Sequence, residues 1–199
     1  MKEIADFLFE TGMLKKTPRS GFQFLGSGNE SVAEHVLQTL YIGYALCKLD
    51  PAADEHKVLR LCLFHDLPEA RTGDMNYMNK KYVTVDEQKA VRELAEPLFF
   101  GDEIMAGLEE FNGRETREAM LARDADQLAF ILQLKECGDL GNKYSQEWIR
   151  FALRRLTTVQ GRRLAECILE TDSSDWWFKD KSDWWVNCRQ EPATESSSP

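Results

Sequence analysis

The stretch CLFHDLPEARTGD, residues 62–74, passes within a few positions from apolar residues to ionisable ones. The ionisable residues on which we focus are His65, Asp66, Glu69 and Asp74. A charged group that is buried at the end of an apolar helix is costly unless something neutralises it. Pro68 removes one backbone hydrogen bond, and its ring crowds the carbonyl group of Phe64. We therefore expect the helix to end or kink at His65 and Asp66.

A metal ion would explain why His65 and Asp66 lie there. Adjacent helical residues point about 100° apart, but both can lean toward one point, especially where a proline disturbs the helix. A cation at that point would neutralise the aspartate and bind the neutral imidazole. His35, on a facing antiparallel helix, could contribute as well. Taken alone, an HD dipeptide is more typical of an N-cap or a surface pair, so its meaning depends on other residues.

The rest of the chain predicts an all-α fold. Apolar residues at positions 4, 7 and 8 begin a first short helix, and the Gly-, Pro- and Ser-rich segment 15–29 predicts a loop. Ser31 and Glu34 form a capping box, Asp50 precedes a proline, and Thr84 with Glu87 suggests a second capping box. Gly101 and Gly138 are expected to close helices. The expected helices cover residues 32–48, 51–66, 85–100, 114–137, 145–156 and 158–171.

Composition limits the function classes. With 199 residues and a net charge of −9, the chain lacks the basic surface of a general nucleic-acid binder. An anionic substrate would need a local metal or a few placed Arg and Lys side chains. The apolar run 36–47 is too short to cross a membrane, and residues 1–13 lack the apolar core of a signal peptide. We expect a cytoplasmic protein whose five cysteines are small buried residues, without a membrane or nucleic-acid partner.

Aromatic residues gather near the C-terminus, where the tetrapeptide SDWW occurs twice within residues 174–185. Packing in the core or at a dimer interface is the main expectation, and stacking on a nucleotide base is the alternative. We expect a single domain, a helical bundle, over residues 1–188. The polar tail 189–199 is expected to be disordered.

Several motifs together resemble a known family. A His on one helix, HD at the end of the next and a later Asp are similar to the signature of HD-domain metal-dependent phosphohydrolases. The resemblance extends to the subfamily of 5′-deoxynucleotidases, and it covers residues from about 5 to about 171. The motifs that carry it are PRSGF, ESVAEH, HDLPEARTGD and ADQLAFILQLKE.

The resemblance implies a metal site. Its ligands match His35, His65, Asp66 and Asp126 in this chain. Asp124 is two residues away in RDADQL, and we expect it to be a surface acid on the helix. The mixed nitrogen and oxygen ligands suit Mn, Co, Fe, Ni or Zn. Members that bind two ions need further histidines, and His56 is expected to be solvated, so the chain should bind one divalent ion.

The resemblance also implies catalytic and substrate-binding residues. Glu69 matches the acid that handles the attacking water or the proton of the leaving group, and Asp74 matches a second acid near the nucleotide. Arg19 matches a phosphate-binding arginine, and its planar guanidinium suits a phosphate dianion. Phe22 stands where relatives tend to carry Trp, which would pack on the sugar or base. Lys80 and Lys81 could attract the anion, although a solvated pair is the alternative.

The expected activity is removal of phosphate from deoxynucleoside 5′-monophosphates by a homodimeric enzyme. One alternative is another small phosphate ester, or a nucleoside triphosphate, as substrate. A second alternative is a non-catalytic helical scaffold held together by the metal. Glu69 and Arg19 argue against the scaffold, since a structural metal needs neither.

Overall fold

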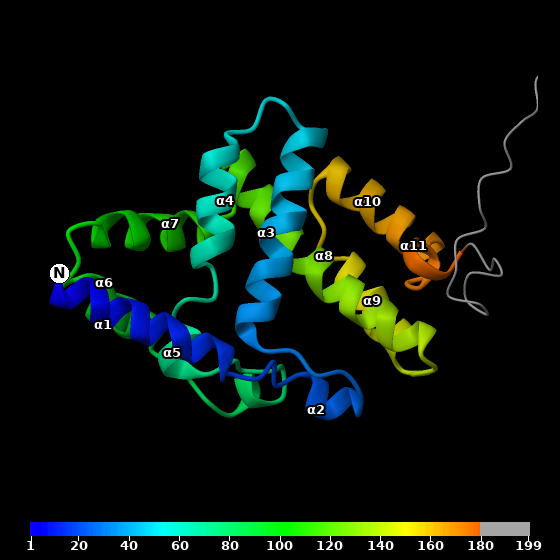
Figure 1. Cartoon of the computed structure of the whole chain (residues 1–199), viewed down its shortest axis with the longest axis horizontal. Helices are drawn as coiled ribbons and strands as arrows, with labels where there is room; N and C mark the ends of the chain where they lie inside the picture. The colour runs from blue at the N-terminus through cyan, green and yellow to red at the C-terminus, as the bar shows by residue number, and fades with distance from the viewer. Residues whose placement is uncertain (180–199) are drawn as a thin grey trace, which may run out of the picture.

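The computed structural model describes residues 1–179, and helices α3 and α8 form its centre. Helix α3 (Val32–Leu49) packs along α8 (Arg117–Asp139), and α4 (Glu55–Phe64) contacts both (Figure 1). The apolar faces of the three helices form the main core, which includes Leu46, Val58, Leu61, Leu121, Leu128 and Ile131. Within residues 1–179, the β-type pairing is limited to one bridge between Pro18 and Ser31. The all-α prediction is confirmed.

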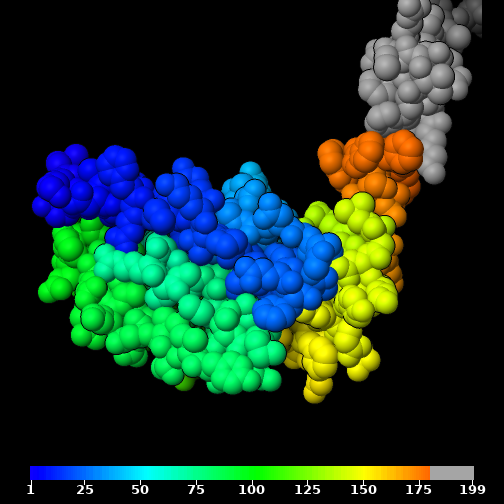
Figure 2. All heavy atoms as spheres, turned by 90° about the horizontal axis from the view of Figure 1, so that it is seen from below, coloured from blue at the N-terminus to red at the C-terminus, as the bar shows by residue number. Residues whose placement is uncertain are grey.

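The remaining helices lie on two sides of this centre. On one side are α1 (Lys2–Thr11), α5 (Glu69–Thr72), α6 (Glu87–Ala95) and α7 (Gly101–Gly113), and on the other α9 (Ser145–Leu153), α10 (Val159–Glu170) and α11 (Asp175–Phe178). The N-terminal segment runs beside the part of the chain after α4 (Figure 2). The Phe7 and Phe100 rings, with centroids 5.7 Å apart, join α1 to the start of α7.

The capping box before α3 and the proline after α4 set the ends of these helices as predicted. The Ser31 hydroxyl accepts a hydrogen bond from the Glu34 amide, and the Glu34 carboxylate accepts one from the Ser31 amide, which completes the capping box of α3. Helix α4 ends at Phe64, and α5 begins at Glu69, so Pro68 marks the break as expected. This break places His65 and Asp66 in a turn between two helices.

Other boundaries differ from the prediction. Helix α4 begins at Glu55 with Asp54 as its N-cap, so the expected start at Asp50 and Pro51 is wrong. The N-cap of α6 is Asp86 instead of Thr84. Gly101 begins α7, a helix that the sequence pattern did not predict. A Cβ atom on Gly101 would lie 2.0 Å from the Ala95 carbonyl oxygen, so a close backbone approach explains the glycine.

One short helical turn ends where the expected loop 15–29 begins, a second lies within the loop, and a third lies further along the chain. They are η1 (Gly12–Lys15), α2 (Phe22–Leu25) and η2 (Asn79–Lys81). No helix among residues 1–179 has both the length and the apolar character of a membrane span.

Two expectations about buried residues need correction. Cys47, Cys62 and Cys137 are buried as expected, but Cys167 is exposed. Trp176, in the first SDWW copy, is 86% exposed, so it does not pack in the core. The second SDWW copy, Cys188 and the expected tail 189–199 lie outside the described residues.

Candidate active site

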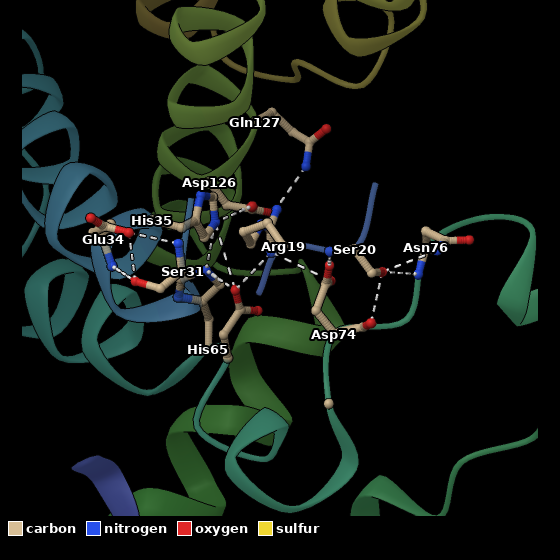
Figure 3. A network of polar contacts seen from close by, with 12 residues as sticks. Arg19, Ser20, Ser31, Glu34, His35, His65, Asp74, Asn76, Asp126 and Gln127 are labelled. Atoms are coloured by element: carbon tan, nitrogen blue, oxygen red, sulfur yellow. Dashed lines mark hydrogen bonds and ion pairs between the residues drawn. The ribbon is translucent and has the colours of Figure 1, made fainter. Parts of the chain in front are cut away.

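Three segments bring His35, His65 and Asp126 together (Figure 3). His35 lies one turn into α3, His65 follows α4, and Asp126 lies near the middle of α8. The Nε2 atom of His35 is 3.1 Å from Asp126 Oδ1 and 3.4 Å from His65 Nε2. One ligand atom from each residue lies within 4.8 Å of the others, so the group could hold a metal ion.

The hydrogen bonds of His65 suit a metal ligand. Its Nδ1 atom lies 2.8 Å from the Cys62 carbonyl oxygen, which can only accept, so Nδ1 carries the proton in the neutral ring. The Nε2 lone pair is then directed into the group, as in metal-bound histidines whose other nitrogen donates to a backbone carbonyl. Burial lowers the pKa of His65, but the charges of Asp66 and Asp126 raise it more. The two carboxylates therefore favour a positive charge beside the His65 ring.

Asp66 lies against both imidazoles. Its Oδ2 atom is 3.3 Å from His65 Nε2, 3.6 Å from His35 Nε2 and 3.2 Å from Arg19 Nη1. Burial raises the pKa of Asp66, but the positive charges of His65 and Arg19 outweigh it, so the pKa falls below its ordinary value. Asp66 is therefore ionised at neutral pH. The structure brings all four expected ligands to one place.

Glu69 is held in a different protonation state from Asp66. Burial and the negative charges of Asp66 and Asp74 raise the pKa of Glu69 to about 9. Its Oε2 atom is buried and has no hydrogen-bond partner within residues 1–179. Lys80 is exposed but near enough for its charge to lower the pKa of Glu69 slightly, whereas Lys81 is an exposed residue of η2. At neutral pH, Glu69 carries a proton that it can give to a nearby atom.

Asp74 fixes the loop that carries Arg19. Its Oδ2 atom accepts a hydrogen bond from the Ser20 amide at 2.6 Å, and its backbone carbonyl accepts one from the Ser20 hydroxyl at 2.8 Å. Asn76 donates to the same hydroxyl (Figure 3). Gly73 precedes Asp74 with a φ of 72°, a conformation that favours glycine. This turn directs Asp74 back toward the Arg19 loop, with Arg19 Nη1 3.7 Å from Asp74 Oδ1.

The choice between the two aspartates of RDADQL agrees with the geometry, but the expected role of Asp124 is wrong. Asp124 is fully buried. Its carboxylate accepts hydrogen bonds from the amides and hydroxyls of Thr157 and Thr158 at 2.6–3.2 Å. Asp124 thus holds the start of α10 against α8, while Asp126 faces the histidines.

Phe22 lies in a small core cluster with Leu25, Leu134 and Ile149, and only 7% of it is exposed. Its ring centroid is 6.4 Å from that of Phe130. These contacts explain Phe22 as a packing residue that anchors α2, so we assign it no contact with a substrate. His56 is exposed, as expected.

Sequence reasoning missed Glu30, a buried carboxyl beside the site. Its backbone carbonyl accepts a hydrogen bond from the Arg19 amide at 2.8 Å, and its Oε2 atom has no hydrogen-bond partner within residues 1–179. Burial raises the pKa of Glu30 to about 7, although the charge of Arg19 opposes the shift. A Glu in the ESVAEH motif gave no sign of burial, because the cause is the distant Arg19 loop.

Glu30→Gln is expected to change how stability depends on pH. The folded protein holds the Glu30 proton up to about pH 7, whereas the unfolded chain loses it near 4.5, so wild-type stability falls as pH rises through this window. The glutamine variant cannot ionise at this position and escapes the loss. We therefore compare the free energy of unfolding of the variant with that of wild type at each pH. This difference should be about 1–2 kcal/mol more favourable to the variant at pH 8 than at pH 5. Urea denaturation at both pH values measures this. An equal difference at the two pH values would contradict the assignment.

Comparison with known proteins places this geometry in a family. The HD domain family matches residues 11–168. The chain belongs to the HD domain family. It is 30% identical to the 5′-deoxynucleotidase HDDC2 of Dictyostelium discoideum over 68% of this chain and 78% of that protein. It is 28% identical to the 5′-deoxynucleotidase HDDC2 of Bos taurus over 71% of each chain. The chain is accordingly an enzyme of the HD phosphohydrolase type.

A solved structure agrees with the fold. A conserved hypothetical protein from Pyrococcus furiosus superimposes with a TM-score of 0.71 at 30% identity, and the match covers 83% of this chain and 97% of that one.

Proposed function

We propose that the protein is a metal-dependent phosphomonoesterase that hydrolyses deoxynucleoside 5′-monophosphates to a deoxynucleoside and phosphate. The observation that carries the proposal is the convergence of His35, His65 and Asp126, with Asp66 against both imidazoles and Arg19 beside them. Relatives named 5′-deoxynucleotidase support this choice of substrate.

In this proposal His35, His65, Asp66 and Asp126 hold one divalent ion. The donor atoms fit it, because one atom each of His35, His65 and Asp126 could hold an ion together, and the Asp66 carboxylate lies against both imidazoles. Both carboxylates are ionised at neutral pH. When bound, such an ion polarises a phosphoryl oxygen and lowers the pKa of water. The metal would be Mn, Co, Fe, Ni or Zn, as the mixed ligand set allows.

Arg19 is the proposed phosphate contact. Burial lowers the pKa of the Arg19 guanidinium, but the charges of Asp66 and Asp74 outweigh burial, so the net pKa is raised. Arg19 is therefore fully charged. Two carboxylates and the Ser20 loop hold this side chain in one place before a substrate arrives. A preset guanidinium orients a phosphate dianion at little entropic cost. Asp74 therefore acts on the substrate mainly by fixing Arg19, and Lys80 adds positive charge nearby.

Glu69 is the proposed proton carrier. Loss of phosphate from a nucleotide leaves an alkoxide on the 5′ oxygen, which must gain a proton. Glu69 is protonated at neutral pH and buried beside Asp66, so it is suited to supply that proton.

The homodimer and the cytoplasmic location expected from the sequence remain part of the proposal. A stripe of exposed apolar side chains on α3 offers a surface for a second copy, formed by Leu37, Tyr41 and Tyr44.

A substrate panel with product identification tests the proposed reaction. Purified protein with added Mn²⁺ or Co²⁺ is incubated with deoxynucleoside monophosphates, ribonucleoside monophosphates, deoxynucleoside triphosphates and non-nucleotide phosphate esters. Inorganic phosphate released fastest from the deoxynucleoside monophosphates is the expected result. Pyrophosphate or triphosphate as product, or no phosphate from any nucleotide, would overturn the proposal.

A further inference from the structure

Gln127 and Arg155 form a hydrogen-bonded pair behind the carboxylate of Asp126. The Nε2 atom of Gln127 donates to Asp126 Oδ2 at 2.9 Å, and Arg155 Nη1 donates to Gln127 Oε1 at 3.1 Å. Figure 3 shows the amide of Gln127 directed toward the carboxylate. Arg155 comes from the segment between α9 and α10, so this pair joins two separate parts of the chain.

The partners determine the orientation of the Gln127 amide. A carboxylate only accepts hydrogen bonds and a guanidinium only donates them. The amide nitrogen must therefore face Asp126, and the amide oxygen must face Arg155. Gln127 is 9% exposed, so water has little opportunity to replace either partner. Arg155 thus fixes the amide in the orientation that Asp126 needs.

The two oxygens of Asp126 have separate roles in this arrangement. Oδ1 faces His35 Nε2 at 3.1 Å, and Oδ2 takes the hydrogen bond from Gln127. Arg123 Nη1 is 3.9 Å from Oδ2, which is beyond hydrogen-bond distance. Gln127 is therefore the side-chain donor that sets the rotation of the carboxylate and keeps Oδ1 directed at the histidines.

The pair also reaches the loop beside the Arg19 site. The guanidinium carbon of Arg155 lies 4.8 Å from the ring centroid of Tyr77, a cation–π contact. Tyr77 follows Asn76, which donates to the Ser20 hydroxyl. A continuous series of contacts thus runs from the loop of Asp74 through Arg155 and Gln127 to Asp126.

We propose that Gln127 is a positioning residue for the metal ligand Asp126 and that Arg155 acts through Gln127. The proposal rests on the proposed metal site. Partners of metal ligands outside the coordination shell commonly change metal affinity about 10–100-fold when they are removed. Neither residue would touch the substrate or the ion, so the effect should appear in metal affinity measured without turnover.

A double-mutant cycle on metal binding tests the proposal. Titration calorimetry gives the Kd for Mn²⁺ of EDTA-treated wild type, Gln127→Leu, Arg155→Met and the double variant. Gln127→Leu is expected to raise Kd about 10–100-fold. Arg155→Met should raise it by a smaller factor, and the double variant should bind no more weakly than Gln127→Leu alone. Gln133→Leu, roughly 9 Å further along α8, is the matched control and should leave Kd unchanged.

The outcomes separate this proposal from the metal site itself. Wild type that binds none of Mn²⁺, Co²⁺, Fe²⁺, Ni²⁺ and Zn²⁺ would overturn the proposed site and the positioning role with it. Wild-type binding together with a Kd within twofold for Gln127→Leu would overturn the positioning role alone. If the fold-increase in Kd of the double variant equals the product of the two single-variant increases, Arg155 does not act through Gln127. If Gln127→Leu fails to fold, Arg155→Met decides, since it keeps an unbranched side chain at a half-buried position, and an unchanged Kd would contradict the proposal.

Discussion

Glu69→Gln is expected to lower kcat for phosphate release by about 10²–10⁴-fold, the range that a positioned acid or base contributes. Glutamine has nearly the same shape but no proton of comparable acidity to give to the 5′ oxygen. The variant should still bind its ion, because the proposed ligands are other residues. Steady-state kinetics combined with metal analysis of the same samples measures both properties. Glu103→Gln, the same change at an exposed position of α7, is the control and should keep wild-type kcat.

The pH profile adds a second readout for Glu69. A residue that must be protonated loses activity as pH rises through its pKa, and burial and the neighbouring charges set the pKa of Glu69 at about 9 when no ion is bound. A bound cation favours the carboxylate form, so the alkaline decline of wild-type kcat is expected below pH 9. This decline should be absent from the residual activity of the variant. A variant that retains more than about a tenth of wild-type kcat would contradict the role of Glu69, and loss of the ion would favour a structural role.

His65→Ala is expected to abolish both metal binding and phosphate release. The variant removes the Nε2 lone pair that the Cys62 carbonyl directs into the group. Losing one of four ligands should raise the Kd for Mn²⁺ by at least about 100-fold, since removal of an outer partner alone can cost that much. Calorimetry and a phosphate assay measure the two effects. His56→Ala changes the same residue type on the exposed side of α4 and should alter neither quantity.

Folding must be separated from binding in that variant. His65 is only 8% exposed, so alanine leaves a cavity that lowers stability. Asp126→Asn keeps the shape of the side chain and removes its charge, and it is expected to lose the ion with a smaller change in unfolding temperature. Metal binding retained by both variants would contradict the proposed ligand set.

The sequence was most informative where the signal is local. The Ser31 and Glu34 capping box lies within four residues, and Pro68 stops α4 through its own missing amide hydrogen. These two signals set the start of α3, which carries His35, and the end of α4, which His65 follows. The ligand residues were identified through a family resemblance, because neither helical periodicity nor composition brings Asp126 to the histidines.

The features that the sequence did not predict depend on partners far along the chain. Asp124 is buried because Thr157 and Thr158, more than thirty residues away, donate to its carboxylate. Phe22 is a core residue because its ring packs near that of Phe130, which lies far along the chain. Gln127 has no distinguishing signal in the sequence, and only its contact with Arg155 shows how its amide is held. The pKa shifts of Glu69 and Glu30 likewise result from packing that no local pattern encodes.

Metal depletion and restoration test the central claim most directly. The protein is stripped with EDTA, Mn²⁺ or Co²⁺ is added in steps, and phosphate release from a deoxynucleoside 5′-monophosphate is followed. We predict negligible release from the stripped protein and recovery that saturates at one ion per chain. Undiminished release after stripping, or no release when Fe²⁺, Ni²⁺ and Zn²⁺ are tried as well as Mn²⁺ and Co²⁺, would contradict a single-metal phosphomonoesterase at this site.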